Sequence, residues 1–201
     1  METITPNGDI GQSTQPIIAS SITSQEWLDD ITINLFCDML KKQFPNVKGL
    51  QDVLFLQNPN FFVQVKENCL QIMNVNNSHW VLWSFNSTII NGVNEVFLYD
   101  SLGPSSLPSE HIDIIFQIIN CNRKALKIIW KNTQIQIGCF DCGLFALANA
   151  TAIAEGNDPS NMSFIQSEMR KHLSKCFETK FITSFPFAGR QPGPNITLHE
   201  N

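Results

Sequence analysis

Residues 136–154 read QIGCFDCGLFALANATAIA and lead from a short loop into a run of small and apolar side chains. The run from Asp141 to Ala154 predicts a helix that packs tightly inside a domain. Strand-like apolar runs precede it in the middle of the chain, at residues 70–75, 80–85, 96–99 and 125–130. Helical patterns lie before, between and after these runs, at residues 27–44, 110–120, 141–154 and 163–177. This order of elements predicts an α+β domain.

The length and composition fit one folded domain with a tail at each end. Of the 201 residues, 43% are apolar and 15% are charged. A charged share well below the usual value of about 25% argues against general disorder. Residues 1–22 and 188–201 are rich in polar residues, Gly and Pro. We therefore expect flexible tails over 1–22 and 188–201, and a single domain over 23–187.

Charge and hydropathy exclude several classes of partner. The chain has 18 acidic and 13 basic residues, a net charge of −5, and nucleic-acid binding normally needs a basic face. It has no apolar run long enough for a membrane span, and its first residues lack the pattern of a secretory signal. We therefore expect an intracellular protein with no nucleic-acid or membrane partner, in which the six cysteines stay reduced.

Cys142 stands at the expected start of the helix, where free backbone N–H groups and the helix dipole stabilise a thiolate. Nucleophilic catalysis by a thiol also needs a histidine, a group that orients it and donors for an oxyanion. His79 precedes strand 80–85, Asp100 closes strand 96–99, and the amide of Gln136 lies six residues before Cys142. Taken singly, these four also fit a buried cysteine, a hydrogen-bonded histidine, a turn aspartate and a surface glutamine.

Cys139 and Cys142 form one CxxC pair, a spacing that also occurs in zinc and redox sites. A zinc site needs two further ligands at metal-like spacing, and the sequence has no second CxxC and no paired histidines. A redox pair needs a thioredoxin-like βαβ context, which the order of elements does not provide. We therefore expect no metal and no cofactor.

Four motifs in this order resemble those of the ubiquitin-like-protein-specific cysteine proteases, the SUMO and NEDD8 proteases related to adenovirus endopeptidase. They are WLDD at 27–30, His79-Trp80, YDSL at 99–102 and Gln136-x-Gly138-x-x-Asp141-Cys142-Gly143. The resemblance covers residues 27–187 and implies a papain-like, adenovirus-protease-like α+β fold, with a central mixed sheet flanked by helices. Asp29 stands where the family usually has Asn, and Cys139 is unusual before DCG. The helix and the segment after it are similar to compact, transposon-associated or stand-alone members.

The resemblance implies a role for each matched position. Cys142 would be the nucleophile, His79 the general base and then the acid, and Asp100 the group that orients His79. Gln136 and the backbone N–H of Cys142 would form the oxyanion hole. The reaction would pass through an acyl-enzyme that water hydrolyses.

The resemblance also implies a channel for the substrate tail. Trp80 and Trp27 match the two tryptophans that bracket a Gly-Gly tail, a space that admits only glycine. Core packing is the other interpretation of both indoles, and Trp80→Ala is expected to damage substrate binding more than folding. Asp30 matches an acidic position that contacts the tail, although capping of the helix start is an equal alternative.

The expected function is therefore that of a monomeric cysteine peptidase or isopeptidase, in the cytoplasm or nucleus, that cleaves after the Gly-Gly-like tail of a ubiquitin-like modifier. Its partners would be the SUMO or NEDD8 class of modifier or their conjugates. Two alternatives remain open. One is a catalytically silent module that binds such modifiers, and the other is an acyltransferase on the same fold.

Overall fold

The computed structural model describes residues 22–57, 61, 63–65, 68–90, 93–104, 108–120 and 126–198. The helices are α2 (Asp30–Gln43), η1 (Val53–Gln57), α3 (Ser109–Ile119), α4 (Cys142–Ala154), η4 (Pro159–Asn161) and α5 (Gln166–Thr179). The strands are β1 (Lys48–Gly49), β2 (Cys69–Val75), β3 (His79–Ile90), β4 (Val93–Tyr99), β5 (Leu126–Trp130), β6 (Met162–Phe164), β7 (Phe187–Gly189) and β8 (Ile196–Leu198).

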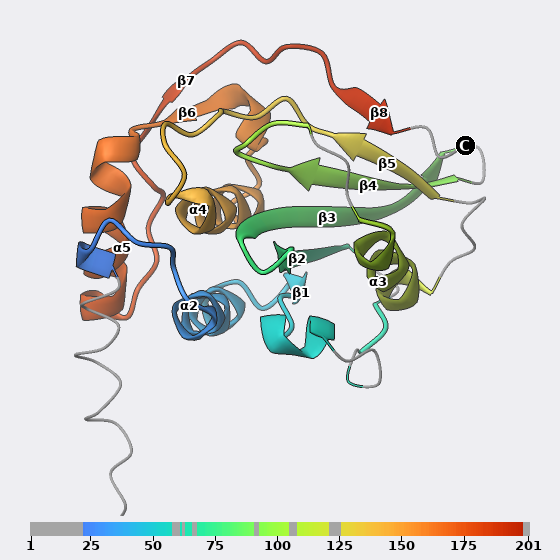
Figure 1. Ribbon diagram of the computed structural model, residues 1–201, viewed down its shortest axis with the longest axis horizontal. Coiled ribbons are helices and arrows are strands. Elements are labelled where there is room, and N and C mark those ends of the chain that lie inside the picture. Colours follow the sequence, from blue (N-terminus) through green and yellow to red (C-terminus); the bar gives the residue numbers. More distant parts are fainter. Residues whose placement is uncertain are drawn as a thin grey trace, which may run out of the picture.

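Six strands form one mixed sheet in the order β1-β2-β3-β4-β5-β8 (Figure 1). β2, β3 and β4 pair antiparallel in its middle, whereas β1 and β5 run parallel to β2 and β4. β8 pairs antiparallel with β5, and β6 and β7 form a separate two-stranded ribbon. The prediction of an α+β domain with a central mixed sheet is confirmed.

Each face of the sheet has its own apolar cluster, because successive side chains of a strand point to opposite faces. In β3, Trp80 and Leu82 belong to the cluster that contains residues of α2, α4 and α5. Val81 and Trp83 belong to the cluster that contains residues of α3. The sheet therefore lies between one group of three helices and one single helix (Figure 1).

Helix α4 forms the centre of the larger cluster. Every residue from Cys142 to Ala152 is buried, as expected for a helix that is apolar on all sides. α4 packs on β3 and on α2. The first turn of α4 is thereby fixed against the strand that begins at His79.

The structure corrects the expected ends of the domain. Residues 188–198 were expected to belong to a flexible tail, but β7 pairs with β6, and β8 pairs with β5 at the edge of the main sheet. The Asn195 side chain also accepts a hydrogen bond from the Asn132 backbone N–H, which holds the approach to β8. At the other end Ile22 is 1% exposed and belongs to the core, while residues 1–21 of the expected tail lie outside the described residues.

The first helix also begins later than its apolar spacing predicts. α2 starts at Asp30, because Asp29 caps it by accepting a hydrogen bond from the Thr32 N–H at 2.8 Å. Trp27 and Leu28 consequently lie in the segment before the helix and not in its first turn. Within the part of the chain that the structure describes, no helix combines the length and the hydropathy needed to cross a membrane.

Candidate active site

His79 and Asp100 meet because they stand on neighbouring strands. His79 is the first residue of β3, and Asp100 directly follows β4. His79 Nε2 lies 2.7 Å from Asp100 Oδ1, and the Leu102 N–H donates to the same oxygen at 2.8 Å. The two side chains are only 12% and 2% exposed. These two hydrogen bonds fix the Asp100 carboxylate. Because His79 presents Nε2 to it, the other ring nitrogen, Nδ1, points away from the carboxylate.

The environment of His79 favours its protonated form. Burial is the largest single influence on its pKa and lowers it, but the Asp100 carboxylate and the Cys142 thiol together outweigh that effect. The result is a pKa raised from 6.5 to about 9. At neutral pH the ring is accordingly an imidazolium next to a sulfur atom. A cation in that position stabilises a thiolate.

Cys142 is the first residue of α4 and is 1% exposed. Its Sγ accepts a contact of 3.5 Å from the backbone N–H of Trp80, which follows His79. The thiol lies close enough to the His79 ring to raise its pKa. Three residues that are far apart in the sequence thus come together as a thiol, an imidazole and a carboxylate.

Gln136 is held beside the segment that follows Asp100. Its Oε1 accepts a hydrogen bond from Ser101 Oγ at 2.6 Å, and its Nε2 donates to the Gly138 carbonyl at 2.9 Å. Its backbone N–H also donates to the Ser101 carbonyl at 2.8 Å. These contacts fix the orientation of the amide and leave Nε2 with one further N–H to donate.

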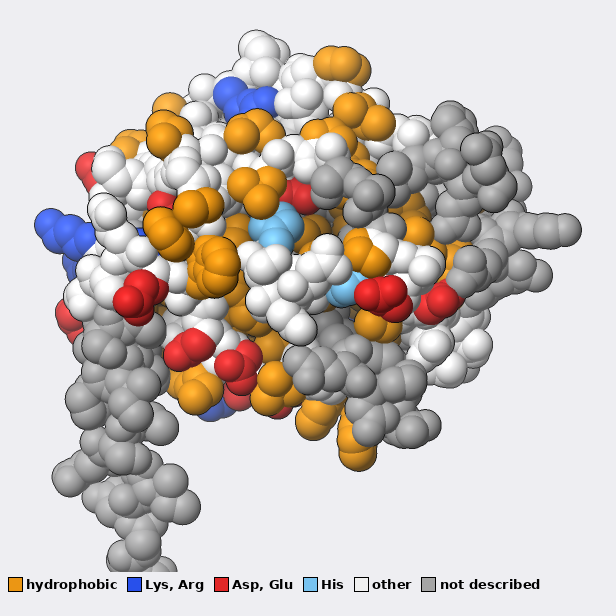
Figure 2. Space-filling model, viewed as in Figure 1, with side chains coloured by type: hydrophobic (Ala, Val, Ile, Leu, Met, Phe, Trp, Pro, Cys, Tyr) orange, Lys and Arg blue, Asp and Glu red, His pale blue; other side chains and the backbone are white. Residues whose placement is uncertain are grey.

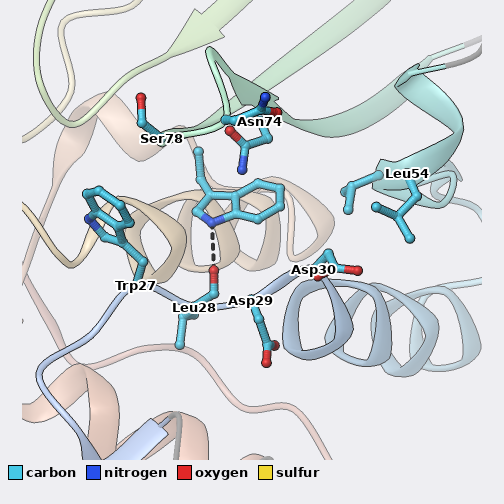
Figure 3. A pocket seen from close by; sticks show the side chains of 10 residues that line it. Trp27, Leu28, Asp29, Asp30, Leu54, Asn74 and Ser78 are labelled. Atoms are coloured by element: carbon cyan, nitrogen blue, oxygen red, sulfur yellow. Dashed lines mark hydrogen bonds between the residues drawn. The ribbon is translucent and has the colours of Figure 1, made fainter.

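A pocket of about 320 Å³ is lined by the expected tail-binding residues. Trp27 and Leu54 stand on opposite sides of it, and Asp29 and Asp30 lie along the start of α2 (Figure 3). Trp80 also lines it and donates from Nε1 to the Leu28 carbonyl at 2.8 Å.

The two tryptophans of this pocket differ in burial. Trp27 is 48% exposed, and its Nε1 donates to the Cys139 carbonyl at 2.6 Å. Trp80 is 5% exposed and belongs to the large apolar core. Truncating a buried Trp costs about 3–5 kcal/mol of folding free energy. The burial of Trp80 therefore argues against the expectation that Trp80→Ala damages substrate binding more than folding, and Trp27 is the better probe of the pocket.

The structure separates the two interpretations of Asp30. Asp29, and not Asp30, caps α2, and both residues line the pocket. The capping role expected as an alternative for Asp30 is thus taken by its neighbour.

Gly143 serves a packing role. A Cβ atom there would lie 3.1 Å from Leu28 Cβ and 3.1 Å from Trp80 Cδ1, closer than most real Cβ contacts. Glycine thus lets the segment before α2 and the Trp80 indole close over the first turn of α4. This keeps the pocket wall next to Cys142.

The sequence did not single out two residues of α5 that bind the loop before Cys142. Gln166 contacts the backbone of Ile137 and the carboxylate of Asp141, and Arg170 contacts the same carboxylate at 2.7 Å. Gln166 and Arg170 lie 25 and 29 residues after Asp141. A contact over this distance in the sequence leaves no local pattern that would predict it.

The described residues of the site include a thiol but no group of side chains that could bind a metal ion. Among the described residues, no three His, Cys, Asp or Glu side chains come together in a way that fits a metal ion. Cys139 is an exposed free thiol, and Cys142 is also free.

A thiol at the start of a buried helix, next to an imidazole and a carboxylate supplied by the sheet, is the set of groups that a cysteine protease needs. The model of the Ulp1 protease family, C-terminal catalytic domain, matches residues 61–181, which is more than half of the chain. The chain belongs to the Ulp1 protease family and is a cysteine protease. The resemblance seen in the sequence is thereby confirmed, as is the expected fold.

Solved structures are similar to this chain in fold at low sequence identity. A de-sumoylating protease superposes with a TM-score of 0.62 at 14% identity, covering 82% of this chain and 85% of that chain. The C-terminal Ulp1 protease domain in complex with Smt3, the yeast ortholog of SUMO, gives 0.58 at 18% identity, covering 82% of both chains. The Xanthomonas campestris effector XopD bound to ubiquitin gives 0.57 at 15%, covering 76% of this chain and 92% of that one. No curated protein matches the chain in a sequence comparison.

Proposed function

We propose that this protease cleaves the peptide or isopeptide bond that follows the Gly-Gly-like tail of a ubiquitin-like modifier, and that Cys142 is its nucleophile. The observation that carries the proposal is the 2.7 Å contact between His79 and Asp100 beside the Cys142 sulfur. Two solved neighbours of the same fold are described in complex with Smt3 and with ubiquitin, which supports a partner of that type.

The proposed reaction uses each group at a defined step. The Cys142 thiolate attacks the carbonyl of the terminal glycine, and the His79 imidazolium gives its proton to the leaving amine. Neutral His79 then takes a proton from water, which hydrolyses the thioester. Asp100 keeps the ring oriented during both transfers. The backbone N–H of Cys142 and the remaining N–H of Gln136 would bind the oxyanion.

The pocket and its surroundings support a protein substrate with an extended tail. Trp27 and Trp80 line a space next to Cys142, and Asp30 lines the same pocket. Several apolar side chains near it are exposed, among them Trp27, Leu54 and Phe140. On the face seen in Figure 2, hydrophobic side chains lie above and beside the central histidine, among polar ones, and such a surface suits the docking of a folded partner.

A panel of modifiers tests this function. SUMO, NEDD8 and ubiquitin, each carrying a C-terminal vinyl sulfone, are incubated with the protein, and the adduct is located by peptide mass spectrometry. We expect at least one modifier to label Cys142, because only a tail that enters the pocket brings the electrophile to the sulfur. A probe whose last glycine is replaced by alanine serves as the control and should not react. If all three modifiers bind reversibly but none forms an adduct, the protein is a silent binding module.

Trp27→Ala is expected to raise KM for the modifier substrate about 10-fold to 100-fold while the fold persists. The indole is half exposed and forms one side of the pocket, so its loss removes tail contacts without opening the core. Phe181→Ala is the matched control, because this aromatic side chain is 56% exposed and is not among the pocket residues. Steady-state kinetics and thermal melts of both variants give the comparison. An unchanged KM in Trp27→Ala would remove this indole from the tail site.

A further inference from the structure

Asp141 stands at the N-cap of α4 but makes no side-chain cap hydrogen bond. The missing cap hydrogen bond is unusual, because aspartate is among the best N-cap residues. Its side chain would normally accept from the free N–H groups of the first turn. Here those groups belong to the turn that carries Cys142. A carboxylate bound there would place a negative charge beside the sulfur and occupy donors that an oxyanion needs.

Two side chains of α5 hold the Asp141 carboxylate. Arg170 donates to Oδ1 from Nη2 at 2.7 Å and from Nε at 3.1 Å. Gln166 Nε2 donates to Oδ2 at 2.6 Å. Both oxygens of Asp141 are therefore engaged by α5, and its charge is opposed by a guanidinium.

The same two side chains also bind backbone groups of the loop before Cys142 and of the segment before Trp27. Gln166 pairs with both the N–H and the carbonyl of Ile137, each at 2.8 Å, next to Gln136. Arg170 donates to the carbonyls of Ser24 at 2.7 Å and Glu26 at 2.8 Å, and more weakly to Phe140 at 3.4 Å. It therefore joins the segment that ends in Trp27 to the loop that ends in Cys142.

We propose that Arg170 and Gln166 are positioning residues, which hold the Asp141 carboxylate away from the first turn of α4 and so keep that turn available to the Cys142 thiolate and the oxyanion. This inference rests on the proposed function, since it assigns Cys142 as the nucleophile. Neither residue touches the sulfur. Among the described residues, two charged pairs flank the segment that carries the sulfur, His79 with Asp100 from the sheet side and Asp141 with Arg170 from the α5 side.

The decisive test is a rescue. Arg170→Gln leaves the Asp141 carboxylate without its cation, so we expect alkylation of Cys142 by iodoacetamide at neutral pH to slow about 10-fold to 100-fold. Adding Asp141→Asn to that variant removes the unopposed charge, and we expect most of the rate to return. A role in folding alone predicts no such recovery, because Asp141→Asn restores none of the hydrogen bonds that Arg170 made.

Two more variants complete the experiment. Lys171→Gln is the matched control, since it removes one positive charge from the adjacent, exposed position of α5 and should react like wild type. Gln166→Ala keeps the Arg170–Asp141 ion pair but removes the Gln166 hydrogen bonds to Asp141 and Ile137, so a smaller loss of about 10-fold is expected. Gln166→Ala also tests the proposal if Arg170→Gln does not fold. A double variant as slow as Arg170→Gln overturns the proposal, as does a Gln166→Ala variant of wild-type rate.

Failure of the proposed function has a different signature. If Cys142 is not the nucleophile, the vinyl sulfone of the modifier does not label Cys142 in the wild type. If only the positioning role is wrong, the wild type is labelled at Cys142 and the variants of Arg170 and Gln166 react at the same rate.

Discussion

Cys142→Ala is expected to abolish both turnover and covalent capture by a modifier vinyl sulfone, with a loss of roughly 10⁴-fold to 10⁶-fold in kcat. The sulfur lies in the first turn of α4, accepts the Trp80 N–H at 3.5 Å and is close enough to the His79 ring to raise the pKa of the imidazole. No other thiol shares these contacts among the described residues. Steady-state kinetics with a modifier fusion and intact mass after exposure to the probe measure the effect.

The control for Cys142→Ala is Cys139→Ala, which removes the exposed thiol three residues earlier. Trp27 binds the backbone carbonyl of Cys139 and not its side chain, so the pocket wall stays in place in this variant. We expect Cys139→Ala to be labelled like wild type. Cys142→Ala should remain folded, since a small buried truncation typically costs about 1 kcal/mol. Labelling that persists in Cys142→Ala and disappears in Cys139→Ala would show that the nucleophile was misassigned.

The sequence predicted the central elements well because their patterns are local. The apolar runs at 70–75 and 125–130 correspond to β2 and β5, and the small-residue run after Asp141 corresponds to α4. The ends of the domain were less predictable. β8 has three residues, too few for a period-2 pattern, and it exists because β5 offers it an open edge.

The site was predicted only in part, because its contacts join distant segments. His79 and Asp100 stand at strand ends, which their position in the sequence already indicated, and the structure places them 2.7 Å apart. Trp27 was assigned to a helix by its spacing, yet its indole instead binds the Cys139 carbonyl, 112 residues away. The sequence gives no sign of such a contact, because both partners look like ordinary loop and helix residues.

The contacts of Arg170 are even harder to predict from the sequence. In the sequence it is one cation within an amphipathic helix, and a solvent-facing position is the usual interpretation. In the structure its guanidinium reaches backbone carbonyls 144 and 146 residues earlier in the chain, together with the carboxylate of Asp141. Only tertiary packing brings these groups together. The aspartate of the DCG motif is therefore held by α5, although the motif begins α4.

Asp100→Asn is expected to lower kcat about 10²-fold to 10⁴-fold and to change the pH dependence of the reaction. Asparagine keeps the shape of the side chain but removes the charge that orients and stabilises the imidazolium. In the wild type, kcat/KM should fall above about pH 9, because the imidazolium of His79 is lost as the pH passes its pKa. In Asp100→Asn that fall should begin at lower pH, since burial still lowers the pKa and the carboxylate no longer raises it.

The same pair predicts how stability depends on pH. The pKa of His79 is raised from 6.5 to about 9 in the folded protein. The stabilisation from its charged contact with Asp100 is therefore complete below about pH 6.5 and is lost as the pH rises through about 9. The melting temperature of the wild type should fall over this range more steeply than that of Asp100→Asn.

Asp158→Asn is the matched control for Asp100→Asn, because it removes a carboxylate from a different ion pair, with Lys131 at 2.8 Å. It should leave the alkaline fall of kcat/KM where it is in the wild type. In the wild type, burial acts to raise the pKa of Asp158, but the contacts with Lys131 and Ser160 outweigh burial and lower it. The contribution of Asp158 to stability is therefore present at neutral pH and lost in acid. The raised pKa of His79 and the lowered pKa of Asp158 thus predict opposite pH dependences of stability. If Asp100→Asn and wild type lose activity at the same alkaline pH, Asp100 does not hold the His79 proton, and the catalytic arrangement proposed above needs another orienting group.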